Sequence, residues 1–383
     1  MLTLITNAEV HAPEPLGQRD VLIADGRIAA VAETIELSGS GLERLDAEGR
    51  WLLPGFVDAL THPCGGGGEG GFGNRTPELG TADFARAGVT CPVGALGTDS
   101  ITRSLEVLYG SVMMLRAQGI DAHMYTGSYR VPPPTLTGDI ARDITLVQPV
   151  IGVGEVAVSD HRSSQPGSDE LRRLAADSRL GGVLSGKAGT VLVHVGDGDS
   201  RLAPLRDALD GSDLPNHSFF PTHVNRSRAL LDEAAGFARQ GAWVDITVST
   251  TPELVAAGDI PALEALQYLL STGAPAEHIS LSSDAGGSLP LYRDGELKGL
   301  TAASPACLLE LLRQTLAQEP SLTTEVLSAL TANPAAALGL TGKGRIGAGV
   351  DADLLLLDPA GGELSAVMAA GRWLVGNGGP YGY

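Results

Sequence analysis

The chain has 383 residues, of which 43% are hydrophobic and 19% are charged, so it can bury a sizeable core and is neither disordered nor fibrous. Its formal net charge of −19, from 26 basic and 45 acidic residues, repels phosphate backbones and anionic lipids, which argues against nucleic-acid and membrane partners. Its three cysteines are widely spaced, and no uncharged apolar run is long enough to span a membrane, so we expect a cytoplasmic protein.

Residues 1–53 have the pattern of short strands. Val21–Val31 predicts a hairpin that turns at Asp25-Gly26, because this dipeptide accepts positive φ at low cost. A further strand is expected over Leu42–Leu53, with a turn at Gly49.

The last part of the chain, residues 344–383, has the same pattern of short strands. It predicts a strand over Gly349–Asp358 and a hairpin over Leu364–Val375 that turns at Gly371-Arg372. Each end alone is too short to bury a core. We therefore expect residues 1–53 and 344–383 to form one small β-sandwich domain, with two independent β caps as the alternative.

Residues 54–343 alternate apolar, β-branched runs with helical patterns. In the segment 228–241 the apolar residues share one helical face and Gly241 supplies the C-cap; the face consists of Leu230, Leu231, Ala234, Phe237 and Ala238. Eight strands are predicted at Gly55–Leu60, Val89–Leu96, Ile120–Thr126, Val150–Val158, Val191–Val195, Phe219–His223, Trp243–Val248 and Ile279–Ser283. Eight parallel strands with crossover helices indicate an α/β fold, a (β/α)₈ TIM-like barrel.

Polar residues follow most of these strands, at the barrel end where chemistry is expected. They are His62, Thr98, Tyr129, Glu155, His194, His223 and Asp284. A lone histidine after an apolar strand is usually structural, but three histidines with two carboxylates favour a metal or catalytic cluster.

Imidazole and carboxylate ligands together suit Zn²⁺. Glu155, His194 and His223 provide three ligands and leave a position for water, while Asp284 is placed to act as general base. Tyr129 is a candidate donor to the oxyanion of a tetrahedral intermediate. The alternative for Tyr129 is a rim residue that packs against residues 132–134.

Short motifs occur in a consistent order between Leu52 and Asp353. They are Pro54–Asp58 with Thr61-His62, Gly65–Glu69, Arg75–Glu78, Leu96–Ser100, Thr126–Tyr129, Ser159–Ser163, Val193–Asp197, Pro221–Arg226 and Ser282–Asp284. In these motifs the chain resembles the isoaspartyl dipeptidase (β-aspartyl peptidase) family of the amidohydrolase superfamily. The motifs around Arg162 and Arg226 are the most specific.

The resemblance implies a role for each matching residue. His194 and His223 resemble ligands of one metal, Asp284 resembles a shared ligand and general base, and Tyr129 resembles the oxyanion donor. Glu69 resembles the carboxylate that pairs with the free amino group of a β-aspartyl dipeptide. The groups that resemble holders of the substrate's carboxylates are Thr98, Arg162, Arg226 and Ser288. The family resemblance also implies a homo-oligomer.

These polar residues also have plain structural readings. Arg162 and Arg226 could form surface ion pairs with neighbours such as Asp160, and Glu69 could be a solvated loop charge, since exposed pairs are common and contribute little.

The chain departs from the family pattern at two positions. None of its three lysines, at positions 187, 298 and 343, lies on the fourth predicted strand, where the family carries a carbamylated lysine; Glu155 takes that place and can bridge two cations. Leu60 stands where the first histidine of a His-x-His pair is expected, and leucine cannot ligate a metal.

The loss at Leu60 weakens the second metal site, leaving it His62, Asp284 and a share of Glu155. We therefore expect one zinc ion on Glu155, His194 and His223, with His62 and Asp284 nearby. A weakly bound second ion and a metal-free barrel are the alternatives, and Cys64 is a poor replacement ligand because it follows a proline in a glycine loop.

Together these features predict a metal-dependent hydrolase that cleaves a β-aspartyl dipeptide or a related small-molecule amide with metal-activated water. Two alternatives remain open. The same barrel can serve a lyase, cyclase or deaminase reaction on an amino-acid-like molecule, or it can bind such a molecule without chemistry.

Overall fold

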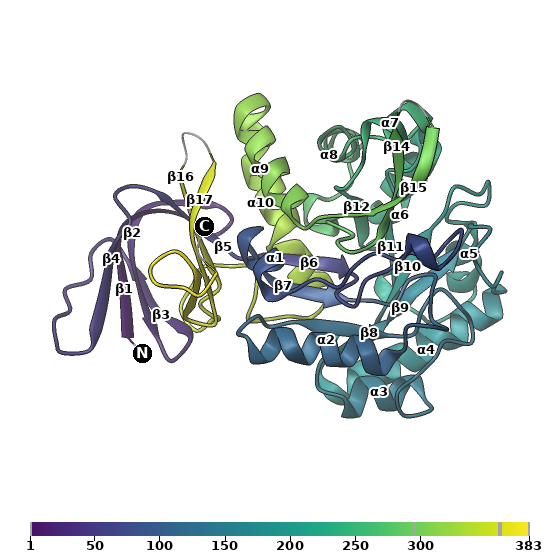
Figure 1. Cartoon of the computed structure of the whole chain (residues 1–383), viewed down its shortest axis with the longest axis horizontal. Coiled ribbons are helices and arrows are strands. Elements are labelled where there is room, and N and C mark those ends of the chain that lie inside the picture. The colour runs from purple at the N-terminus through teal and green to yellow at the C-terminus, as the bar shows by residue number, and fades with distance from the viewer. Residues whose placement is uncertain (1, 294–295, 359–361, 382–383) are drawn as a thin grey trace.

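The computed structural model describes residues 2–293, 296–358 and 362–381, and Figure 1 shows a small β-rich part beside a larger α/β part. Strands from both ends of the chain lie together in the β-rich part, far from one another in sequence and adjacent in space.

One sheet of eight strands joins the two ends of the chain. Its order is β18-β17-β16-β5-β1-β2-β3, with β4 beside β1. The strands are β1 Leu2–His11, β2 Pro15–Ala24, β3 Arg27–Ala32, β4 Leu42–Asp46, β5 Trp51–Pro54, β16 Leu354–Asp358, β17 Glu363–Ala369 and β18 Arg372–Val375. The antiparallel ladder between β5 and β16 pairs Leu53 with Leu355 and joins the two ends. Strands from both ends of the chain therefore belong to one sheet.

The turns of this sheet follow the predicted chemistry. Asp25 and Gly26 have φ of 49° and 81° between β2 and β3, as a two-residue hairpin turn requires. The second hairpin turns one residue earlier than predicted, because Ala370 and Gly371 have positive φ and Arg372 already belongs to β18.

All eight strands predicted for the middle of the chain are present. They are β6 Phe56–Thr61, β7 Val89–Gly94, β8 His123–Thr126, β9 Val150–Val158, β10 Thr190–Val195, β11 Phe219–Thr222, β12 Val244–Thr247 and β13 Ile279–Ser282. β6 to β11 form a six-stranded parallel sheet in chain order, and β12 and β13 form a separate parallel pair. A parallel bridge from Thr61 to Ala285 places the end of β13 beside β6. The sheet is curled, and the carboxyl ends of its strands meet on one side (Figure 1).

Helices surround these strands. They are α1 Thr81–Arg86, α2 Leu105–Ala117, α3 Ile140–Leu146, α4 Ser168–Ser185, α5 Ala203–Leu209, α6 Arg228–Arg239, α7 Pro252–Ala257, α8 Ala262–Ser271, α9 Ala306–Gln318, α10 Thr323–Leu330 and α11 Ala332–Ala337, with 3₁₀ turns at Phe72–Asn74, Asn216–Ser218, Ala276–His278 and Pro320–Leu322. An antiparallel hairpin of β14 Ser288–Arg293 and β15 Glu296–Ala302 follows β13.

Helix α6 confirms the predicted amphipathic pattern, since all five residues of its apolar face are buried. The helix ends at Arg239, Gln240 is the C-cap, and Gly241 follows with φ of 88°. Within the described ranges, no helix is both long and apolar enough to cross a membrane.

Two buried acids connect the separate ladders. Asp58 of β6 accepts hydrogen bonds from the backbone N–H (3.0 Å) and the hydroxyl of Ser283, next to the end of β13. Asp245 of β12 accepts from Thr222 Oγ1 at 2.7 Å and Ser282 Oγ at 2.6 Å, on the strands to either side. Burial raises the pKa of Asp58 to about 7 and that of Asp245 to about 6. These bonds hold the residue after Ser283, Asp284, in place.

Candidate active site

A buried cluster of two histidines and one glutamate lies at the strand ends. Glu155 on β9, His194 on β10 and His223 just after β11 have ligating atoms within 4.8 Å of one another. His194 Nδ1 lies 2.8 Å and His223 Nε2 lies 3.1 Å from Glu155 Oε1. The other oxygen, Oε2, is buried without a hydrogen-bond partner in the described part of the chain. This oxygen lies 3.7 Å from His62 Nε2, too far for a hydrogen bond, and a buried carboxylate with such an oxygen beside two imidazoles fits a cation ligand set.

The protonation states of this cluster suit metal binding. Burial opposes ionisation of Glu155, but the hydrogen bonds with His194 and His223 outweigh it and hold its pKa well below the usual value. Burial, helped by the nearby Arg226 charge, lowers the pKa of His223 to about 4. A charged carboxylate and a neutral imidazole are the forms that ligate a metal.

His62 and Asp284 pair with each other beside this cluster. His62 Nε2 lies 3.0 Å from Asp284 Oδ1, and Nδ1 lies 3.0 Å from the Ala95 carbonyl oxygen. Burial would lower the pKa of His62, but Asp284 and Glu155 outweigh it and raise it to about 9. The five predicted metal ligands are therefore brought to one place, but they divide into a compact group of three and an adjacent pair.

The structure also shows what surrounds Leu60. Its side chain is fully buried in an apolar cluster that includes Tyr125, Leu192 and Phe220. Cys64 is buried, its thiol faces the Gly65 carbonyl oxygen, and burial raises its pKa to about 11. The group of potential metal ligands among the described residues accordingly consists of Glu155, His194 and His223 and does not include Cys64.

Asp160 is a site residue that sequence analysis did not assign to the site. Its Oδ2 lies 2.9 Å from His194 Nε2 and accepts a hydrogen bond from Arg162 Nη2 at 2.7 Å. Burial would raise the pKa of Asp160, but these bonds outweigh it and hold it well below the usual value. The sequence feature that points to Asp160 is its place in the motif Ser159–Ser163, two residues before Arg162. From the sequence alone, Asp160 is expected only as a surface ion-pair partner of Arg162.

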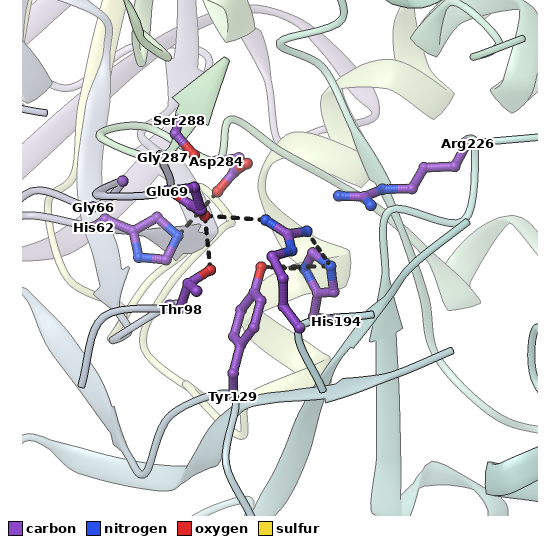
Figure 2. Close-up of a pocket in the computed structure, with 13 residues that line it drawn as sticks. His62, Gly66, Glu69, Thr98, Tyr129, His194, Arg226, Asp284, Gly287 and Ser288 are labelled. Atoms are coloured by element: carbon purple, nitrogen blue, oxygen red, sulfur yellow. Dashed lines mark hydrogen bonds and ion pairs between the residues drawn. The ribbon is translucent and has the colours of Figure 1, made fainter. Parts of the chain in front are cut away.

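One small cavity, of about 50 Å³, collects the predicted substrate-binding residues (Figure 2). Its lining includes Glu69, Thr98, Arg162, Arg226 and Ser288, with the candidate catalytic residues Tyr129 and Asp284. In Figure 2 Glu69 and Thr98 lie on one side of His194 and Arg226 lies on the other.

Glu69 is held by two of these neighbours. Its Oε1 accepts from Thr98 Oγ1 at 2.8 Å and from Arg162 Nη1 at 3.1 Å. Its Oε2 is buried and has no hydrogen-bond partner among the described residues. The carboxylate is therefore positioned by the chain and retains an acceptor for a donor from outside it.

The backbone at two strand ends is strained where the site residues lie. His223 and Asp284 have φ of 61° and 54°, a region that residues other than glycine seldom adopt. A side chain at Gly287 would bring its Cβ within 2.6 Å of Asp284 Oδ1, so only glycine lets the loop fold against this carboxylate.

Comparison with known proteins gives a consistent family. The amidohydrolase family matches residues 51–374. A β-aspartyl dipeptidase from Fervidobacterium islandicum AW-1, solved with a β-Asp-Leu dipeptide, is 42% identical over 99% of this chain and 98% of that chain, with a TM-score of 0.90. A second structure of that enzyme is 41% identical over the same shares, with a TM-score of 0.89.

More distant matches bear on the fold and on one segment. Dihydropyrimidinase from Brevibacillus agri NCHU1002 is 17% identical, with a TM-score of 0.65 over 99% of this chain and 96% of that chain, and shows the shared fold alone. Dihydroorotase from Staphylococcus aureus MRSA252 is 39% identical over 94 residues. That match spans 24% of this chain and 21% of the dihydroorotase.

Proposed function

Because the chain belongs to the amidohydrolase family, we propose that it hydrolyses β-aspartyl dipeptides, or a closely related amide, with one zinc ion. The observation that carries the proposal is the pair of buried carboxylate oxygens without partners, Oε2 of Glu69 and Oε2 of Glu155. Each needs a close donating or positive partner, because no described residue hydrogen-bonds to either oxygen and the nearby His62 Nε2 lies 3.7 Å from Oε2 of Glu155. A substrate ammonium meets the first need and a metal ion meets the second.

The zinc ion would be held by Glu155, His194 and His223, whose donor atoms and spacing fit it. When bound, zinc acidifies water and polarises a carbonyl group. Leu60 supports a single ion, because the position of the absent histidine is filled by packed aliphatic carbon.

Asp284 is the proposed general base. It lines the cavity, and His62 fixes one of its oxygens at 3.0 Å. We propose that it takes a proton from the attacking water and passes it to the departing amine. The strained backbone and the glycine loop around it keep this carboxylate directed into the cavity.

Tyr129 is the proposed donor to the developing oxyanion. Burial keeps the pKa of its hydroxyl well above the usual value, so the hydroxyl retains the proton that it must donate. The hydroxyl lies 2.7 Å from His194 Nδ1 and is therefore beside the three candidate metal ligands.

Glu69, Arg162 and Arg226 suit the charges of a dipeptide zwitterion. Glu69 presents its free oxygen to the ammonium, and the Arg226 guanidinium can hold a carboxylate in a fixed orientation. Arg162 already donates from Nε and Nη2 to Asp160 and from Nη1 to Glu69, so Nη1 would be shared between Glu69 and a substrate carboxylate. Thr98 steadies Glu69, and Ser288 lines the same cavity as a further hydrogen-bonding group.

Turnover of β-Asp-Leu, followed by release of free leucine from the zinc-loaded protein, tests this proposal. Glu69→Gln should raise KM by about 10- to 100-fold, because a charged hydrogen bond to the ammonium is lost. Glu78→Gln, an exposed acid on the same loop, is the matched control and should leave KM unchanged. No release of leucine by protein that carries zinc would overturn the proposal.

The finer architecture is also part of the proposal. We propose that the six-stranded sheet and the β12–β13 pair close into a (β/α)₈ barrel over residues 54–343, supported by the bridge from Thr61 to Ala285. Residues 1–53 and 344–383 would be the companion β-sandwich domain. A homo-oligomer and a cytoplasmic location stay predictions.

A further inference from the structure

A second, larger cavity adjoins the candidate active site. It has a volume of about 300 Å³ and shares Arg162, Arg226, Asp284 and Ser288 with the first cavity. Its other walls come from α7 and β14, which contribute Leu254 and Leu289. The shared residues place this cavity next to the proposed scissile bond, on the side of Arg226.

Ser249, Asp259 and Asp197 are among the polar side chains of this cavity that the proposed mechanism does not use. Ser249 is 8% exposed, and its hydroxyl is buried without a hydrogen-bond partner in the described part of the chain. Asp259 is half-buried, and Asp197 lies exposed at the rim. The Ser249 hydroxyl is therefore available to hydrogen-bond a water or a polar ligand group that enters the cavity.

Asp259 adds charge to this wall. Burial raises the pKa of Asp259 to about 6, although Arg226 opposes the rise, so the carboxylate is ionised at pH 8. Arg226 forms no close ion pair among the described residues, although its charge acts on Asp259. A substrate carboxylate bound to Arg226 would offset that positive charge, so Asp259 and Asp197 would present a net negative charge to the rest of the substrate.

We propose that this cavity binds the side chain of the amino acid released from the substrate, and that Asp259, with Asp197 and Ser249, selects side chains that carry a positive charge or a hydrogen-bond donor. The inference rests on the proposed function and names its substrate class, β-aspartyl dipeptides whose second residue is basic. Dipeptides with an apolar second residue should have a lower kcat/KM, and those with an acidic second residue the lowest. The apolar carbons of Leu254 and Leu289 suit the methylene stem of such a side chain.

The test compares kcat/KM for β-Asp-Lys, β-Asp-Leu and β-Asp-Glu at pH 8. The kcat/KM for the lysine peptide should exceed that for the glutamate peptide by roughly tenfold, because Asp259 and Asp197 attract the lysine side chain and repel the glutamate side chain. The preference for the lysine peptide should shrink in 1 M salt. At that ionic strength the Debye length is about 3 Å, so partly exposed charges that lie farther apart are largely screened.

Variants assign the preference to Asp259. Asp259→Asn should bring the lysine-to-glutamate ratio to within about twofold, and Asp259→Lys should invert it. Asp213→Asn, an exposed acid outside both cavities, should leave the ratio unchanged. Cleavage of β-Asp-Leu by each variant shows that the site is intact.

Three results would overturn the inference, and they can be told apart. Equal kcat/KM for the lysine and glutamate peptides, or an unchanged ratio in Asp259→Asn, would remove the selectivity while the proposed function stands. Turnover of none of the three peptides by zinc-loaded protein would remove the proposed function and this inference with it.

Discussion

The Nε2 atom of His194 lies 2.9 Å from Oδ2 of Asp160, and this contact sets which ring nitrogen faces the glutamate. In the metal-bound protein a proton on Nε2, directed at Asp160, would leave the Nδ1 lone pair free to ligate the ion beside Glu155, whose Oε1 lies 2.8 Å from Nδ1. Asp160 also accepts from Arg162 Nε at 2.9 Å. One acid thus orients a candidate metal ligand and a candidate substrate ligand.

Asp160→Asn should weaken zinc binding by about 10- to 100-fold, because a side-chain amide nitrogen cannot accept the His194 proton and the preferred tautomer is lost. Competition titration with a chromophoric chelator measures the change. Asp199→Asn, an exposed acid on the loop after β10, is the control. Unchanged affinity in Asp160→Asn would show that packing alone orients the ring.

Glu155→Gln should abolish stable zinc binding, because it removes the only negative charge from the group of three ligands at nearly constant volume. Zinc per chain, measured by atomic emission after gel filtration, should fall from about one to a small fraction. Circular dichroism should show retained secondary structure. Full zinc content in this variant would place the ion elsewhere.

Asp284→Asn should lower kcat by about 10²- to 10⁴-fold while zinc content stays near that of the unmodified protein. The reason is that Asp284 pairs with His62 and lies outside the compact ligand group. Parallel measurement of kcat and zinc per chain distinguishes the two roles. Loss of zinc together with activity would make Asp284 a required ligand.

Leu60→His should lower the free energy of unfolding by roughly 1–3 kcal/mol without metal, because a polar ring replaces a fully buried aliphatic side chain. Added zinc should restore much of this loss by filling a second site, and zinc per chain should rise above that of the unmodified protein. Leu60→Gln, which is polar but a poor zinc ligand, should be destabilised without recovery. Equal thermal shifts for the two variants would argue against a second site.

Asp58→Asn should change how stability depends on pH. The folded pKa of Asp58 is raised to about 7, so its contribution to stability is complete below its unfolded pKa and is lost as pH rises through 7. Asparagine can keep both contacts with Ser283, accepting from the N–H and donating to the hydroxyl oxygen.

The advantage of Asp58→Asn over the unmodified protein should therefore grow between pH 4 and pH 8, by roughly 1.4 kcal/mol per unit of pKa shift at most. Urea unfolding of both proteins at four pH values measures it. A constant difference across this range would show that Asp58 ionises normally in the fold.

The sequence by itself determined the strands, the amphipathic helix and the candidate site residues. Strands such as Val150–Val158 and the apolar face of α6 are legible because burial imposes a local period on the chain. The residues at strand ends were also predictable, because parallel strands bring their carboxyl ends to one side. The remaining candidate substrate-binding residues, including Glu69 and Arg226, were predicted from motifs that resemble those of the isoaspartyl dipeptidase family.

Only the tertiary structure decided which of these residues lie together and which partners each one contacts. The grouping of Glu155 with two histidines, the separate pair of His62 and Asp284, and the contact of Asp160 with His194 each depend on distances of a few ångströms between residues on different elements. The adjoining cavity with Asp259 is formed by loops, α7 and β14, and no local sequence period predicts how these segments are placed. Local patterns report burial, whereas the direction of a side chain and its partners are set by packing between segments distant in sequence.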